Sequence, residues 1–191
     1  MLNEKLFVRL KKEYDTYESA RRDLIGVSNG TLSKAKQAIF ALHRDDMSAA
    51  DALLQEVERT FGNLEKQFKQ LPELRYEGAY RAALEEYVEA KLFCEWMRIG
   101  KVVELKGMQI DADTYLAGLS DFTGELTRKA VQRATQGRAQ EVEKLAEVVR
   151  DVVEQLIKFD LTGYLRTKYD QAKQNLRRVE EVIYDMHMRR K

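Results

Sequence analysis

A repeat of apolar side chains near the end of the chain restricts the fold more than any other feature. Its members follow one another in alternating steps of four and three: Leu165, Tyr169, Ala172, Leu176, Val179, Ile183 and Met186. This spacing places all of them on one face of a helix, which must pack against other helices. The seam is longer than one small bundle normally buries, so we expect helix faces of this chain to mediate self-association. Ordinary packing within a single chain is the alternative.

The remaining sequence has the same helical character. It contains one proline, Pro72, and no segment with the alternating pattern of a β-strand. Gly, Pro, Asp, Asn, Ser and Thr mark the expected helix ends. These ends lie at residues 28–31, 45–48, 71–73, 100–110, 137 and 160–163. The sequence therefore predicts an all-α, antiparallel bundle of about seven helices, which forms a single domain over residues 1–191.

Composition excludes several classes of protein. Charged residues make up 34% of the chain but the net charge is only +1, so overall charge does not indicate a nucleic-acid partner. The single cysteine, Cys94, excludes a disulfide framework and suits a reducing compartment. No stretch approaches the roughly 20 apolar residues of a membrane span, and the first ten residues lack the pattern of a signal peptide. We therefore expect a cytoplasmic protein with no membrane partner.

Four carboxylates on two predicted helices are the strongest candidates for a functional site. Glu86 and Glu89 form an E-x-x-E pair, and Asp121 and Glu125 form a D-x-x-x-E pair. Residues three or four apart share one face of a helix, so each pair directs both carboxylates the same way. If the helices pack side by side, a hard divalent cation would relieve the repulsion and desolvation of four converging acids. The alternative is that they pair with Lys and Arg on a solvated face, as we expect for the neighbouring Glu85.

The chain lacks the residues of other helical metal sites. A di-iron bundle requires Glu-x-x-His on two helices, but the only histidines, His43 and His187, stand outside that motif. A zinc site lacks cysteine and histidine ligands. The carboxylate pairs are therefore the only metal-binding pattern that the residues support.

Basic residues lie near the predicted acidic face. Arg128 follows Glu125 by about one helical turn, Lys129 and Arg133 come next, and Lys36 lies on the first part of the chain. Cations beside an acidic metal site are what a phosphodiester substrate needs. The candidates for nucleic-acid contact are therefore Lys36, Arg128, Lys129 and Arg133, although each basic cluster taken singly is more typical of a solvated surface. Further basic clusters lie at residues 177–178 and 189–191.

Several stretches of the sequence match the motifs of a known family. They are Lys36 with I-F-A-L-H-R at 39–44, E-Y-V-E-A at 86–90, D-T-Y-L-A-G followed by D-F-T-G-E-L within 113–126, and Y-D at 169–170 with V-E-E-V-I-Y-D at 179–185. Together they resemble the translin superfamily. The acidic motifs are similar to those of the translin-associated factor X (TRAX) branch, and the last helix is similar to that of translin. The likeness runs from about residue 5 to the end.

This resemblance implies a seven-helix fold that assembles into a hollow, roughly octameric shell, in which TRAX-type subunits cleave single-stranded RNA with acidic residues and Mg²⁺ or a similar ion. By motif, Glu86, Glu89 and Asp121 correspond to the catalytic, metal-binding acids, and Glu125 to a further member of the metal site. Lys36 corresponds to a lysine that stabilises phosphate charge. A TRAX-like site and a translin-like last helix in one chain imply a homo-octamer rather than a mixed shell.

We therefore expect a metal-dependent endoribonuclease that uses Mg²⁺ or Mn²⁺ to cleave single-stranded RNA. Two alternatives stay open. One is a non-catalytic shell that binds single-stranded RNA or DNA, as translin alone mainly does. That alternative is weakened because residues 75–81 lack the basic, histidine-bearing segment of translin. The other is an all-α nucleotide pyrophosphatase, which also uses E-x-x-E motifs on helices.

Overall fold

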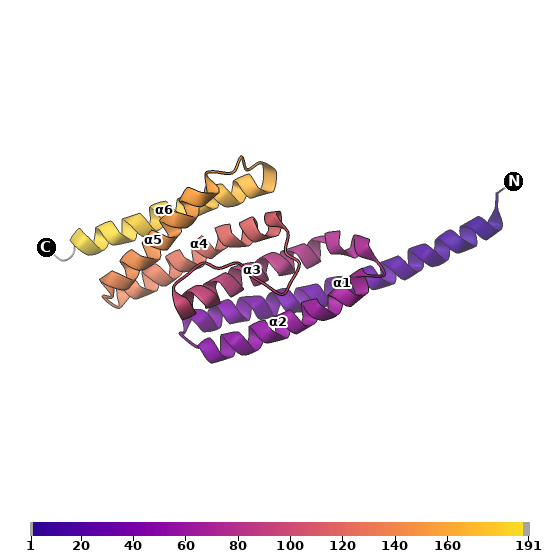
Figure 1. Cartoon of the computed structure of the whole chain (residues 1–191), viewed down its shortest axis with the longest axis horizontal. Helices are drawn as coiled ribbons and strands as arrows, with labels where there is room; N and C mark the ends of the chain where they lie inside the picture. The colour runs from indigo at the N-terminus through magenta and orange to yellow at the C-terminus, as the bar shows by residue number, and fades with distance from the viewer. Residues whose placement is uncertain (1, 189–191) are drawn as a thin grey trace.

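The computed structural model describes residues 2–188, and helices account for all regular structure in that range (Figure 1). The α-helices are α1 (Glu4–His43), α2 (Met47–Phe68), α3 (Gly78–Ile99), α4 (Ala112–Thr135), α5 (Ala139–Leu156) and α6 (Gly163–Met188), and a short 3-10 helix, η1, covers Pro72–Tyr76. No strand occurs within the described range, so the all-α prediction is confirmed. None of the described helices is long and apolar enough to cross a bilayer. The basic segment 189–191 lies outside the described residues.

The first helix is longer than the sequence predicts. A break was expected at residues 28–31, but α1 continues through them for a total of 40 residues, which is why six α-helices are found instead of seven. Ser28 and Thr31 are buried inside this region, and the Thr31 hydroxyl donates to the Val27 carbonyl oxygen at 2.8 Å. The predicted break was wrong because packing against α2 and α3 outweighs the roughly 1 kcal/mol that Gly30 costs in a helix.

The other helices end close to the predicted positions. The carboxylates of Asp46 and Asp111 cap α2 and α4 by accepting hydrogen bonds from the backbone N–H groups of Ala49 and Thr114 at 3.0 and 2.7 Å. Gly100 ends α3 in the left-handed conformation that favours glycine. Local turn chemistry therefore sets the helix lengths after α1.

Four helices run side by side in one direction. They are ordered α1, α3, α4 and α6, while α2 packs on α1 and α3, and α5 packs on α4 and α6 (Figure 1). The ion pairs Arg21–Glu77 and Lys36–Glu86 show that α1 and α3 advance in parallel. Helices joined by tight turns are antiparallel, as predicted. However, the irregular segment 101–110 crosses the molecule and makes α3 parallel to α4.

The apolar seam of α6 packs within the chain. Tyr169, Ala172 and Val179 are buried, and Leu176, Ile183 and Met186 are partly buried against the same core. Contacts with α4 and α5 cover this face. Packing within one chain therefore accounts for the seam, which does not by itself require a second copy.

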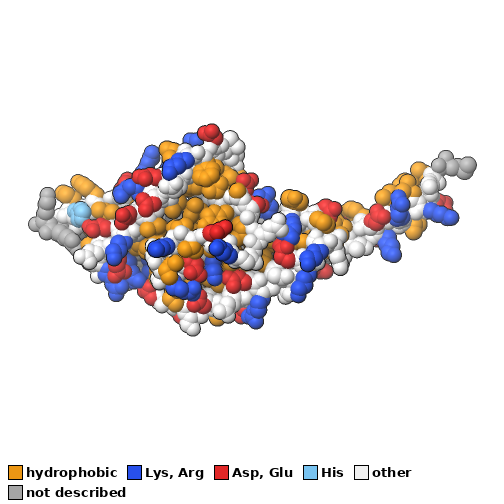
Figure 2. All heavy atoms as spheres, in the orientation of Figure 1, with side chains coloured by type: hydrophobic (Ala, Val, Ile, Leu, Met, Phe, Trp, Pro, Cys, Tyr) orange, Lys and Arg blue, Asp and Glu red, His pale blue; other side chains and the backbone are white. Residues whose placement is uncertain are grey.

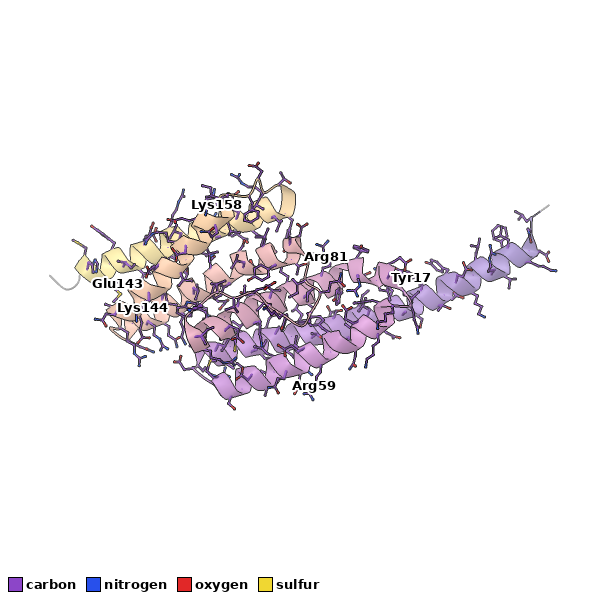
Figure 3. All side chains as sticks on the ribbon, in the orientation of Figure 1. Tyr17, Arg59, Arg81, Glu143, Lys144 and Lys158 are labelled. Atoms are coloured by element: carbon purple, nitrogen blue, oxygen red, sulfur yellow. The ribbon has the colours of Figure 1, made fainter. Side chains whose placement is uncertain are left out.

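The beginning of α1 projects away from the rest of the molecule (Figure 1). Tyr17, labelled in Figure 3, is the first residue of α1 that packs on the core. Before it, Leu6, Phe7, Leu10 and Tyr14 leave apolar side chains exposed, and Figure 2 shows hydrophobic atoms among the charged ones along this projection. The projecting part of α1 thus presents apolar surface that this chain does not cover.

Candidate carboxylate site

Helices α3 and α4 approach each other closely at a glycine. A Cβ atom on Gly118 would lie 2.7 Å from the side chain of Val88 and 2.9 Å from the carbonyl oxygen of Glu85. Only glycine leaves room for this approach. The Val88 side chain and the Glu85 backbone of α3 occupy the space beside Gly118. The crossing places the E-x-x-E pair of α3 beside the D-x-x-x-E pair of α4.

Glu89 lies at the centre of the four predicted carboxylates. Its side chain is buried, and burial together with the negative charges of Glu86, Asp121 and Glu125 raises its pKa to about 9. Burial also raises the pKa of Glu86 and of Asp121. The fold therefore brings together the acids that the sequence singled out, and Glu89 carries a proton at neutral pH.

Helix α1 adds two groups to this site. Lys36 extends its ammonium to 3.4 Å from a carboxylate oxygen of Glu86, and about half of its side chain stays exposed. His43, two turns further along the same face, forms a hydrogen bond between its Nε2 and a carboxylate oxygen of Glu125. The His43 ring also packs on Phe93. His43 had no predicted role, because its partner Glu125 is 82 residues away and only the I-F-A-L-H-R segment at 39–44 singled it out.

Helix α6 contributes Lys168, which the sequence did not single out. Its ammonium binds the Asp121 carboxylate and lies 2.6 Å from the carboxylate of Glu85. The Tyr164 hydroxyl donates to the same Glu85 carboxylate at 2.7 Å. Burial alone would lower the pKa of Lys168, but its hydrogen bonds to Asp121, Glu85 and Tyr164 raise it overall. Glu85 was expected to be an ordinary solvated charge, and it is instead a partly buried part of this network.

The site contains more carboxylates than basic side chains, and this excess of negative charge favours a positively charged ligand. In the described part of the chain, no three His, Cys, Asp or Glu side chains are gathered as a set of metal ligands. The carboxylates instead contact Lys36, Lys168 and His43. The donor set nevertheless suits a hard divalent cation, because it consists of carboxylate oxygens whose crowding makes full ionisation unfavourable.

The basic residues that follow on α4 separate into two groups. Arg128 is half exposed and lies 3.7 Å from Glu125, at the edge of the site. Lys129 and Arg133 are buried and both contact Asp45. Their burial does not fit the predicted contact with nucleic acid, and we do not include them among the groups proposed to bind it.

A cavity of about 780 Å³ adjoins the site at the beginnings of α3, α4 and α6. Glu85 and Tyr164 form part of its wall, so the network around Lys168 separates this cavity from the four carboxylates. Arg81, labelled in Figure 3, lines the same cavity.

Comparison with known proteins places the chain in a family. Residues 19–190 match the Translin family, so this chain belongs to it. The chain is 23% identical over 205 residues to the Translin-associated protein X homolog of Schizosaccharomyces pombe, which covers 97% of this chain and 89% of that protein. It is 29% identical to human translin over 85 residues, covering 44% of this chain and 37% of translin.

Solved structures share the fold. The crystal structure of apo-NeC3PO matches with a TM-score of 0.87 at 22% identity, over 97% of this chain and 98% of that chain. The structure of an AfC3PO–duplex RNA complex also matches with a TM-score of 0.87 at 22% identity, over 96% of this chain and 97% of that chain. The predicted translin-type fold and the resemblance to TRAX are thus confirmed.

Proposed function

We propose that this chain is a metal-dependent endoribonuclease that cleaves single-stranded RNA at the carboxylate site. The observation that carries the proposal is the convergence of four carboxylates from α3 and α4 around the buried Glu89, whose pKa is raised by burial and by the charges of the other three. The acids come from two motifs that resemble those of TRAX. A solved structure of the same fold contains RNA, which supports RNA as the class of substrate.

Glu86, Glu89, Asp121 and Glu125 would hold Mg²⁺ or Mn²⁺. When bound, such an ion supplies Lewis-acid polarisation of the phosphate and a water of lowered pKa. For the acids to accept it, Glu89 must release its proton and Asp121 must release Lys168. The long, flexible lysine side chain allows this exchange, because Lys168 keeps Glu85 as a second partner.

The basic groups at the edge of the site have a separate task. Lys36 and Arg128 have half-exposed side chains and lie beside Glu86 and Glu125, within reach of a phosphodiester that enters from solvent. Their positive charges offset the negative charge that builds up on the phosphate during attack. His43 holds the Glu125 carboxylate in a fixed orientation.

Self-association as a homo-octamer is part of this proposal. The exposed apolar residues on the projecting part of α1 support it, because apolar surface of this kind marks an interface in soluble proteins. Light scattering on the purified chain tests it. A mass near that of one chain, 22.3 kDa, would exclude a shell.

The decisive experiment uses an end-labelled single-stranded RNA with Mg²⁺, with Mn²⁺ and with EDTA. We expect cleavage with either metal, none with EDTA, and loss of cleavage in the Glu86→Gln/Glu89→Gln variant. The control is Glu147→Gln/Glu154→Gln, which removes two exposed carboxylates of α5. Unchanged cleavage by the Glu86/Glu89 variant would overturn the proposal.

A non-catalytic shell that binds single-stranded RNA or DNA is the second candidate. One observation favours it: Lys36 and Lys168 neutralise part of the acidic charge through their contacts with Glu86 and Asp121. Binding of the same oligonucleotide in EDTA, without cleavage in Mg²⁺ or Mn²⁺, would select this candidate.

A further inference from the structure

One exposed aromatic side chain lies at the edge of the carboxylate site. Phe40 stands between Lys36 and His43 on α1, four residues after the first and three before the second, so the three share one face. About half of Phe40 is exposed, whereas Ile39 and Leu42 beside it are buried. Packing into the apolar core therefore does not account for a phenylalanine at position 40.

Arg128 connects this aromatic ring to the acids. Its guanidinium carbon lies 5.0 Å from the centroid of the Phe40 ring, and its Nη1 lies 3.7 Å from Glu125. Phe40 and Arg128 thus meet across the site from α1 and α4. The result is a planar cation over an aromatic ring, with Lys36 one helical turn away from Phe40.

This combination matches the chemistry of a nucleotide. Unpaired bases stack on aromatic rings and on arginine guanidinium planes, and phosphates bind lysine and arginine. We propose that Phe40 and Arg128 form a stacking platform for an unpaired nucleobase next to the phosphate that is cleaved. This inference rests on the proposed function, because it takes RNA as the ligand of the carboxylate site.

The platform would also select single strands. In a duplex, each base stacks on its neighbours and pairs through its edge, so a side chain reaches its face only after the base leaves the helix. Stacking is tolerant of sequence, since every base has an aromatic face. The platform therefore predicts preference for unpaired RNA without strong preference among bases.

The test measures binding alone, in EDTA, so that cleavage and metal play no part. Fluorescence anisotropy compares a labelled eight-residue oligouridylate with an abasic oligoribonucleotide of the same length. For Phe40→Leu we expect a loss in affinity of roughly tenfold for oligouridylate and no loss for the abasic chain. Phe40→Trp should restore binding, and its indole fluorescence should be quenched by oligouridylate. The matched control is Phe159→Leu, which changes a phenylalanine of the same exposure.

Three outcomes would overturn the proposal. The first is an equal loss for both oligonucleotides in Phe40→Leu, which would mean that the ring only supports the local fold. The second is a wild-type protein that does not distinguish the two oligonucleotides. The third is a change in assembly mass in Phe40→Leu, since the ring would then be a contact between copies. A failed cleavage assay with selective binding intact would refute the nuclease and leave the platform standing.

Discussion

Two clusters of charged side chains lie close together on α4, and they are built in opposite ways. Around Asp121 and Glu125, acids outnumber bases, and Glu89 is protonated because burial, together with the charges of the neighbouring carboxylates, raises its pKa. Two turns beyond Asp121, Lys129 donates to the carbonyl oxygens of Leu42 and His43 at 3.0 and 3.1 Å and to Asp45 at 2.8 Å.

The second cluster is complete without any ligand. It satisfies the last carbonyl groups of α1, which have no partner within the helix, and places a cation at the negative end of the helix dipole. Burial lowers the pKa of Lys129, and hydrogen bonds from Lys129 and Arg133 outweigh the effect of burial and lower the pKa of Asp45. Buried charge therefore does not by itself indicate a ligand-binding site. An excess of charge of one sign does, because a ligand of opposite charge is needed to balance it.

The largest effect on stability should come from the second cluster, in which Lys129 and Arg133 contact Asp45. Lys129→Met leaves the carbonyl group of His43 without this donor, leaves that of Leu42 with only the backbone N–H of Asp45, and removes one of the cations that contact the Asp45 carboxylate. We expect the free energy of unfolding to fall by roughly 3–5 kcal/mol. Urea denaturation followed by circular dichroism measures this. The control is Lys144→Met, which removes an exposed lysine of α5 (Figure 3) and should change stability little. An equally small effect of Lys129→Met would show that the second cluster does not stabilise the fold.

Removing an ionisable group from the acidic cluster around Glu89 should instead raise the free energy of unfolding at neutral pH. The folded chain holds the Glu89 proton up to a pH of about 9, whereas the unfolded chain releases it near 4.5. Because the folded state binds this proton more tightly, stability falls as pH rises from about 4.5 to 9, by about 3 kcal/mol at pH 7.

Glu89→Gln removes that penalty. In EDTA the variant should be more stable than wild type at pH 7 and 9 and equal to it near pH 4, as measured by urea denaturation at the three pH values. Glu154→Gln on α5 is the exposed control. A wild-type stability that is level from pH 5 to 8 would show that burial and the neighbouring acids do not raise the pKa of Glu89.

Divalent cations should neutralise the excess negative charge of the acidic cluster. At about thirty times its Kd, Mg²⁺ should stabilise the wild-type chain by about 2 kcal/mol. Binding at pH 7 should release a proton from Glu89, which calorimetry in two buffers of different ionisation enthalpy detects. Neither effect should occur in Glu86→Gln/Glu89→Gln. Equal stabilisation of that variant would place the ion elsewhere.

The smallest effect tests the helix crossing that assembles the acids. Gly118→Ala places a methyl group within 3 Å of Val88 and Glu85, and should cost roughly 1–2 kcal/mol and weaken Mg²⁺ binding. Gly30→Ala in α1 meets no atom within 4 Å and should stabilise by up to about 1 kcal/mol. Thermal unfolding of both variants measures the contrast, which would vanish if α3 and α4 can separate freely.

Much of the fold was predictable because its information is local. Apolar spacing identifies the buried face of α6, and Asp46, Asp111 and Gly100 mark helix ends through their own hydrogen bonds and backbone conformations. The continuous α1 was not predictable in this way, because the helix survives Gly30 only through contacts with α2 and α3.

Spacing along one helix already shows which carboxylates share a face, because that depends on no other part of the chain. The surroundings of those carboxylates depend on how the helices pack. This packing brings His43 and Lys168 to the acids from α1 and α6, and it buries Lys129 while leaving Arg128 exposed. Adjacent residues on α4 point in directions about 100° apart, so whether each is buried or exposed depends on which helices pack on its side.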